Sequence, residues 1–268
     1  MIAARATWSI RAIRADRVAE DIRRSPVYLG GVRAPHATSA VSVGADAPIL
    51  EVMSTLRAMR RLKPDPVPDE LLERLVQAAS WAPNAGNEQA YQFVVVTDRD
   101  VMARLAELWG RSVDAYLGSL GRVTAATQDA RVIKAGLYQR DHFHETPAVI
   151  VPCHPKFQMD PRTTYRMLRS FTLGEAARLI VRGPRMNVIA EASSVYPGVQ
   201  NLLLAARALG LGAVLTIWHL MLEHEWKREL GIPKGINTLA VIPVGWPRGR
   251  FGPVTRKPAA ELIHRDRW

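Results

Sequence analysis

Apolar residues recur at intervals of three or four from residue 46 onward, which is the spacing of an amphipathic helix. Asp46 can cap a helix and Pro48 suits a first helical turn, so the pattern predicts a first helix over 46–62. A second helix opens with an acidic first turn at 68–70 and ends at 81–83. The chain therefore enters its folded part through two consecutive helices.

Short β-branched runs alternate with further helical stretches in the rest of the chain. The predicted strands are 93–97, 147–153, 213–217 and 237–245. One predicted helical stretch follows Asp98. Further helices are predicted over 172–181, which ends at a break at 182–184, over 193–209 and over 223–230. Gly210 stands just beyond one of them, as expected at a helix C-terminus. No repeat or linker interrupts the pattern, which indicates one α+β domain over 46–268.

Residues 1–45 show no sustained periodicity, and after Arg24 they are rich in Gly, Pro, Ser and Ala. Such a segment has no apolar face to bury, so we expect a disordered N-terminal extension. It also lacks the contiguous apolar core of a secretory signal.

The formal net charge of +11 raises the alternative of a nucleic-acid-binding protein. The charge is dispersed, however, and only six of the 36 basic residues are lysine, which favours a compositional origin. The longest charge-free stretches, 192–206 and 208–222, carry polar residues and Gly and are too short for a membrane span. We therefore expect neither a nucleic-acid partner nor a membrane partner.

The single cysteine, Cys153, excludes an internal disulfide and a Cys-rich metal site, and a cytoplasmic location suits it. At the end of an apolar strand it is interpreted as a buried, inert thiol. No spacing of His and acidic residues predicts a metal site; the only near-cluster is His142, His144, Glu145 and His154. Dinucleotide-binding, P-loop and serine-hydrolase motifs are absent.

Several separated segments, taken together and in order, resemble the nitroreductase family of FMN-dependent oxidoreductases. They are LRAMRRLKPDPVPDE at 56–70, APNAGNEQ at 82–89 leading into 93–96, VQNLLLAARALGLG at 199–212, LGIP at 230–233, VGWP at 244–247, and Arg256. The resemblance covers 48–268 except for the middle stretch, 100–190, where family members differ in the cover over their substrate.

This resemblance implies an α+β fold with a mixed, mostly antiparallel sheet flanked by helices, in an intertwined homodimer with two composite sites. It also implies FMN as cofactor and NADH or NADPH as co-substrate. Hydride would pass in ping-pong fashion through flavin N5 to a small acceptor such as a nitroaromatic, a quinone or an enone. Because the cofactor carries this chemistry, no side chain is named as a catalytic acid or base.

The resemblance also assigns the residues that would bind FMN. A phosphate is well matched by guanidinium groups, and Arg57 and Arg60 are expected on one face of the first helix. The alternative for them is a solvated arginine run at a helix C-terminus. The residues for the phosphate and ribityl chain are Arg57, Ala58, Met59, Arg60 and Arg256.

The remaining assignments concern the flavin ring. Ser194 would approach the flavin across the dimer interface, and its alternative is a helix N-cap. A polar loop would reach the ring from the other subunit, although it also suits a simple turn; its residues are Pro83, Asn84, Ala85 and Asn87. A backbone amide facing flavin N5 would come from Leu215, Thr216 and Ile217.

The chain departs from the family pattern at three places. Asn84 stands where a serine is usual, Ala90 and Tyr91 replace a Pro-Trp pair, and Leu56-Arg57-Ala58 replaces a frequent Arg-Arg-Ser. Other functions therefore stay open. One is a flavoenzyme of the same fold that performs reductive dehalogenation or flavin fragmentation, and another is a non-catalytic flavin carrier or basic nucleic-acid-binding protein.

Overall fold

The structure is a computed structural model that describes residues 41–44, 46–119, 130–157 and 159–268. The predicted N-terminal extension, 1–45, lies outside the described residues except for its last positions. The chain divides into two compact units. The larger is 41–254, and the described part of the smaller is 255–268.

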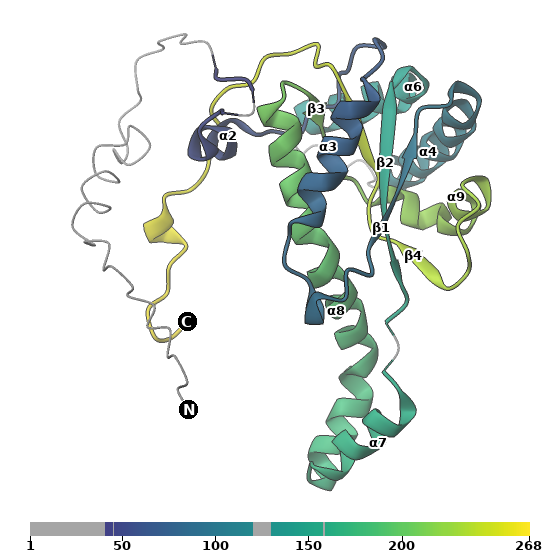
Figure 1. The fold of residues 1–268 in the computed structure, drawn as a ribbon, viewed down its shortest axis with the longest axis vertical. Helices are drawn as coiled ribbons and strands as arrows, with labels where there is room; N and C mark the ends of the chain where they lie inside the picture. The colour runs from purple at the N-terminus through teal and green to yellow at the C-terminus, as the bar shows by residue number, and fades with distance from the viewer. Residues whose placement is uncertain (1–40, 45, 120–129, 158) are drawn as a thin grey trace, which may run out of the picture. The chain divides into compact units, whose positions relative to one another are not determined.

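Helices and strands of the larger unit follow the order expected of an α+β chain (Figure 1). The helices are α2 (Ile49–Thr55), α3 (Asp69–Ser80), α4 (Arg99–Ser119), α6 (Ala130–His142), α7 (Pro161–Arg169), α8 (Leu173–Ala208) and α9 (Glu223–Glu229). Short 3₁₀ helices are η1 (Ala85–Asn87), η2 (Phe143–Glu145), η3 (Trp218–Leu222) and, in the smaller unit, η4 (Ala259–Glu261). The strands are β1 (Gln92–Val96), β2 (Ala148–Pro155), β3 (Gly212–Ala213), β4 (Ile236–Thr238) and β5 (Ile242–Gly245).

The sheet has the order β1-β2-β5-β3, with β4 paired to the far end of β2, and each of these pairings is antiparallel. Alternate residues of β2 point to opposite faces. Ile150 packs in the hydrophobic core under α3 and α8, whereas Val149 and Val151 pack in a second core under α4 and α9. Because both faces are covered, β2 is apolar from Ala148 to Cys153, which explains why its sequence predicts a buried strand.

Two predicted strands are shorter than expected. The run 237–245 is divided into β4 and β5: Thr238 pairs with Cys153 and Ile242 pairs with Ile150, so the run has one more residue than β2 between these pairs. The run 213–217 contains only the end of the two-residue strand β3, followed by a bridge between Thr216 and Val241. Strand β1 lies at the sheet edge and is only partly buried, so its β-branched residues do not mark a central strand.

Helix α8 runs unbroken where the sequence predicts a break at 182–184. Its first turn is a capping box in which Thr172 and Glu175 satisfy each other's backbone amides. Proline inside a helix costs on the order of 3 kcal/mol, and packing of the C-terminal half of α8 in the core offsets that cost. Ser194 therefore lies inside a helix, and its alternative role as an N-cap is wrong.

Helix α2 ends at Thr55, seven residues before the predicted end. Leu56 adopts an extended conformation, and Met59 N donates a hydrogen bond to Ala213 O at 3.0 Å. Backbone pairing beside β3 thus replaces helical hydrogen bonding over this stretch. Arg57 and Arg60 consequently lie beyond the end of the helix, and the prediction that they share a helix face is wrong.

Candidate functional site

A cavity of about 360 Å³ in the larger unit brings together residues that are far apart in the sequence. Four of its lining residues belong to the predicted FMN site: Arg60, Leu215, Thr216 and Ile217. The other four are Trp109, Gln139, Tyr196 and Trp218. The fold therefore joins the first arginine segment to the segment that follows β3.

Arg60 is a half-buried cation at this cavity. Burial lowers the pKa of its guanidinium below the ordinary value, but an arginine stays protonated in proteins. None of the described residues forms a hydrogen bond or an ion pair with this guanidinium. A desolvated, unpaired guanidinium is suited to an anionic ligand, and a phosphate group meets that requirement.

The 215–217 segment offers backbone groups to the same cavity. Thr216 N donates to Val241 O at 3.0 Å, and Val241 N donates to Thr216 O at 2.8 Å. The Thr216 amide is therefore engaged in the bridge to Val241. If an amide of this segment faces the flavin ring, it belongs to Leu215 or Ile217.

Aromatic side chains form another wall of the cavity. Trp109 and Trp218 stack with ring centroids 5.8 Å apart, and Trp218 stacks on Tyr116 at 4.3 Å. Trp109 is 1% exposed, and its indole N–H has no hydrogen-bond partner among the described residues. A buried donor without a partner is unfavourable. The aromatic wall and the unpaired cation at Arg60 fit the ring and the phosphate of FMN.

The predicted loop and Ser194 meet at a different place. Ala85 N donates to Ser194 Oγ at 3.3 Å, and Asn84 Oδ1 accepts from Gln89 N at 2.9 Å. Asn84, Ala85 and Ser194 also line a small cavity of about 20 Å³, which shares no lining residue with the Arg60 cavity. Pro83 and Asn87 are exposed on the same loop. The loop turns tightly because Gly86 has a φ of 59°.

Helix α8 separates these two groups of residues. Ser194 is 5% exposed and faces the loop, whereas Tyr196 lines the Arg60 cavity and donates its hydroxyl to Leu239 O at 2.9 Å. Two residues along an α-helix correspond to a rotation of about 200°, so these side chains leave opposite sides of α8. Within one chain, Ser194 and Arg60 are therefore not brought to the same cavity.

The other predicted phosphate residues have separate environments. Arg57 is exposed, and its Nη2 donates to Pro253 O at 2.9 Å. Ala58 is exposed, whereas the Met59 side chain is buried and could reach a ligand only through its backbone. Arg256 belongs to the smaller unit, where its Nη1 donates to Thr255 O at 2.8 Å. Their contacts with FMN stay predictions.

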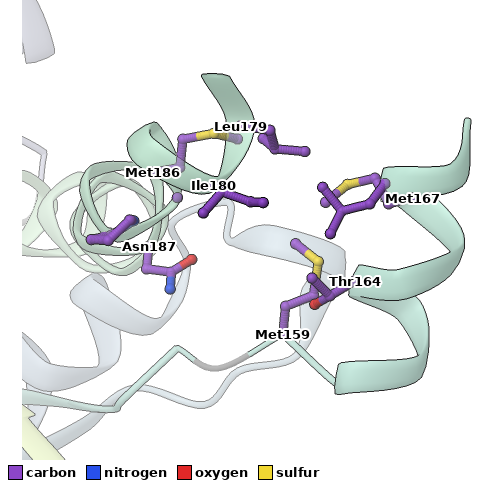
Figure 2. Close-up of a pocket in the computed structure, with 10 residues that line it drawn as sticks. Met159, Thr164, Met167, Leu179, Ile180, Met186 and Asn187 are labelled. Atoms are coloured by element: carbon purple, nitrogen blue, oxygen red, sulfur yellow. The ribbon is translucent and has the colours of Figure 1, made fainter. Parts of the chain in front are cut away.

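A larger apolar cavity, of about 480 Å³, lies between α7 and the outer half of α8 (Figure 2). Met159, Met167 and Met186 contribute to its lining, together with Leu179 and other residues. No charged residue lines it, so it offers no partner for a phosphate. It falls in the stretch where the family resemblance predicts a substrate cover.

Two further observations bear on other kinds of site. Cys153 is buried, and burial raises the pKa of its thiol to about 11, which confirms the inert thiol expected from the sequence. Within residues 41–44, 46–119, 130–157 and 159–268, no three His, Cys, Asp or Glu side chains gather closely enough to hold a metal ion. No helix in the described part of the chain combines the length and apolarity needed to cross a membrane.

Sequence reasoning missed four residues of the Arg60 cavity: Trp109, Gln139, Tyr196 and Trp218. Trp218 directly follows the predicted 215–217 segment, so its position could have been found. In the sequence, Trp109 cannot be told from an ordinary apolar position of α4. Its place at the cavity depends on stacking with Trp218, over a hundred residues away. Gln139 is 4% exposed on α6, and no sequence signal distinguishes it from a surface residue.

Comparison with known proteins identifies the class to which this fold and site belong. The model of the nitroreductase family matches residues 55–246. The chain therefore belongs to the nitroreductase family. This membership confirms the predicted α+β fold and the predicted enzyme class, an FMN-dependent NAD(P)H oxidoreductase.

The relatives of this chain include proteins with different names. The chain is 25% identical to a putative NADH dehydrogenase/NAD(P)H nitroreductase of Archaeoglobus fulgidus, over 82% of this chain and 98% of that protein. It is 33% identical to iodotyrosine deiodinase 1 of Rattus norvegicus, over 80% of this chain and 67% of that protein. A crystal structure of oxidized iodotyrosine deiodinase bound to FMN and 3-iodo-L-tyrosine is similar in fold, with a TM-score of 0.56 and 19% identity over 82% of this chain and all of that chain.

Proposed function

We propose that this protein binds FMN in the Arg60 cavity and uses NADH or NADPH to reduce nitroaromatic, quinone or enone acceptors. The observation that carries the proposal is the half-buried, unpaired cation at Arg60, which shares one cavity with the 215–217 segment. Its guanidinium lacks an anionic partner, which the FMN phosphate would supply. A cytoplasmic location, where reduced nicotinamides are available, suits this function.

The chain's residues have distinct tasks in this proposal. Arg60, together with Arg57, binds the phosphate, and the amides of 215–217 contact the ring. The stacked aromatic wall excludes water from one side of the cavity. When bound, FMN supplies the hydride chemistry between the nicotinamide and the acceptor. The chain positions and stabilises the reacting partners without a side-chain acid or base.

The active form in this proposal is a homodimer with two composite sites. The Arg60 cavity and the loop with Ser194 lie on opposite sides of α8, so one chain cannot place both around the same ring. A two-fold related copy can bring its loop and its Ser194 to the Arg60 cavity. In this arrangement the loop residues Pro83, Asn84, Ala85 and Asn87 contact the flavin that the other subunit binds.

An apolar face of the larger unit supports this dimer. Ile49, Leu50, Met53 and Trp81 are exposed, and Trp81 is the most exposed of them at 74%. Beside them α2, α3 and α8 form a groove of about 680 Å³ with a largely apolar lining. A contiguous apolar face of this kind indicates a protein interface.

A second candidate function is reductive dehalogenation of a halogenated aromatic compound. The similarity to rat iodotyrosine deiodinase 1 over most of this chain favours it. The same cavity, cofactor and dimer would serve both functions. The difference would lie in the residues that cover the acceptor.

The decisive experiment begins with the colour of the purified protein. We expect a yellow protein with bound FMN whose visible flavin absorbance is bleached by NADH or NADPH without oxygen, and is then restored by an acceptor. A nitroaromatic, a quinone, an enone and an iodinated phenol are compared as acceptors. Restoration by the iodinated phenol alone would select dehalogenation. A protein that keeps FMN but is not bleached would be a flavin carrier, and a protein without FMN would overturn the proposal.

A further inference from the structure

Arg207, in the last turn of α8, carries a guanidinium that is completely buried. Removing a charged group from water is unfavourable unless it is paired and hydrogen-bonded. A buried guanidinium therefore needs several hydrogen-bond and charge partners in a fixed arrangement around it. The partners of Arg207 show which groups these are.

The Arg207 guanidinium contacts three separate segments of the larger unit. Its Nε donates to Thr55 Oγ1 at 2.8 Å, and its Nη1 donates to Ser42 O at 2.8 Å. Its Nη2 lies 3.5 Å from Glu51 Oε1, and the Phe251 ring packs 4.7 Å from its central carbon. One side chain thus joins the start of the described chain, helix α2 and the segment around 251.

The Glu51 carboxylate closes this network. It accepts hydrogen bonds from Ser42 N at 2.7 Å and from Ser42 Oγ at 2.8 Å. These bonds, more than the nearby Arg207 charge, lower the pKa of the Glu51 carboxyl. Glu51 is therefore ionised at neutral pH and complements the buried guanidinium.

The segments held by Arg207 are those that carry Arg57. Thr55 is the last residue of α2, and the arginine segment begins directly after it. Val254 N donates to Ser54 O at 2.9 Å, and Arg57 Nη2 donates to Pro253 O at 2.9 Å. The end of α2 and residues 251–254 are therefore bound both to each other and to Arg207.

We propose that Arg207 is a positioning residue for the phosphate site: it fixes the end of α2 and the 251–254 segment, and so aims Arg57 and Arg60 at the cofactor phosphate. This inference rests on the proposed FMN function. Arg207 contacts no ligand in this scheme. It acts through Thr55 and Phe251 on the segments that carry the phosphate-binding groups.

The test compares FMN with riboflavin, which has the same ring and ribityl chain but no phosphate. Dissociation constants of both flavins are measured for the wild type and Arg207→Met by quenching of flavin fluorescence. We expect the wild type to prefer FMN, and we expect Arg207→Met to lower this preference by about tenfold, with riboflavin affinity nearly unchanged. A merely structural role would weaken both flavins equally and leave their ratio at the wild-type value.

Met102→Ala is the matched control, because Met102 lies on α4 and is fully buried in the other hydrophobic core. It should lower the melting temperature without changing the FMN-to-riboflavin ratio. If Arg207→Met does not fold, Thr55→Val replaces it, since it removes the hydroxyl that accepts from Arg207 Nε. We expect a loss of about threefold in the ratio for Thr55→Val.

The outcomes separate this inference from the function on which it rests. A wild type that binds neither flavin, or binds both equally, contradicts the proposed phosphate site. A wild type that prefers FMN, together with a folded Arg207 network variant that keeps the full preference, overturns the positioning role alone. A control that loses the preference as strongly as Arg207→Met also overturns it, because the effect would then follow from stability.

Discussion

Arg60 and its neighbour Arg61 are residues of the same type in different environments. Arg60 is half-buried, lines the cavity and has no described partner, whereas Arg61 is exposed and packs over the Tyr138 ring at 4.9 Å. The two guanidinium groups are therefore chemically equal but placed differently.

Arg60→Ala should weaken FMN binding by tenfold or more, because a charge-assisted hydrogen bond to a phosphate contributes on the order of 1.5–3 kcal/mol. Arg61→Ala is the control and should change the dissociation constant of FMN by less than about threefold. Fluorescence titration of the cofactor-free protein measures both. Equal losses for the two variants would show that general positive charge, and not the cavity, binds the cofactor.

His219 is a buried histidine in the core beside the cavity. Its Nε2 lies 3.1 Å from Thr238 Oγ1, and that hydroxyl donates to Glu223 Oε1 at 2.9 Å. The Thr238 hydroxyl therefore accepts from His219 Nε2–H, while Nδ1 has no partner among the described residues. Burial lowers the pKa of His219 from 6.5 to about 4, so the ring is neutral in the folded protein.

Between pH 6.5 and 4 the unfolded chain therefore binds a proton at His219 that the folded chain does not bind. As the pH is lowered through this window, the free energy of unfolding should decrease. His219 should contribute about 2 kcal/mol of this decrease between pH 7 and pH 5. Urea unfolding of the wild type, His219→Gln and the exposed-site control His224→Gln measures it. We expect His219→Gln alone to lose this part of the pH dependence; an unchanged slope in that variant would contradict the buried neutral ring.

At the scale of elements, helix α8 contains two glycines, of which one is tightly packed and the other has open space around it. A Cβ at Gly198 would lie 2.7 Å from Ala79 O, so this glycine allows α3 and α8 to approach closely. A Cβ at Gly183 would meet no atom within 4 Å, although this residue is inside the same helix. The packing of α3 on α8 therefore depends on Gly198 and not on Gly183.

Gly198→Ala should destabilise the protein by about 1–3 kcal/mol, because the obstructing atom is backbone and cannot rotate away. Gly183→Ala should stabilise it by about 0.5–1 kcal/mol, since alanine loses less conformational entropy in a helix. Thermal unfolding of both variants gives the comparison. Stabilisation by both variants would mean that helix propensity, and not the contact with α3, governs this helix.

At the scale of the whole molecule, the proposed composite site links cofactor binding to assembly. The loop with Ser194 and the cavity with Arg60 lie on opposite sides of α8, so a single chain supplies only part of the contacts to any one flavin. An obligate dimer with an apolar interface of roughly 2,000 Å² or more would complete each site. Flavin content and subunit association should then change together.

Dilution of the FMN-loaded protein should release the flavin in parallel with dissociation of the dimer, because the monomer retains only part of the binding contacts. Recovered FMN fluorescence reports release, and light scattering reports molecular mass, over the same concentration series. Ser194→Ala serves as a companion variant, expected to shift both flavin release and dimer dissociation to higher protein concentration, because it removes one contact that the partner subunit contributes. Monomers that keep full FMN occupancy would exclude the composite site.

Much of the fold could be predicted from local sequence signals. The second helix, the strand at β2 and the helix stop at Gly210, whose φ is 79°, follow from spacing, β-branched content and glycine chemistry. The family resemblance similarly selected Arg60 and 215–217, which the fold brings to one cavity. These features are short-range, or they are carried by motifs that the chain shares with its family.

Other features depend on contacts between distant parts of the chain. Helix α2 ends at Thr55 because the next residues pair with the segment at β3, and no local sequence signal predicts that pairing. Helix α8 continues through Pro184 although local rules favour a break, because its packed C-terminal half compensates. The stacking of Trp109 on Trp218 joins residues over a hundred positions apart.

The sequence by itself determined the α+β class, most helix and strand positions, the enzyme family and the residue types that suit a flavin phosphate. Hydrophobic spacing, turn chemistry and shared motifs carry that information locally. Only the tertiary structure decided that Arg60 lies at a cavity while Arg57 is exposed, that Ser194 and Tyr196 leave opposite sides of α8, and that Arg207 joins three segments. The physical reason is that burial and hydrogen-bond partnership depend on which distant segments meet, whereas helix and strand propensity depend on neighbours along the chain.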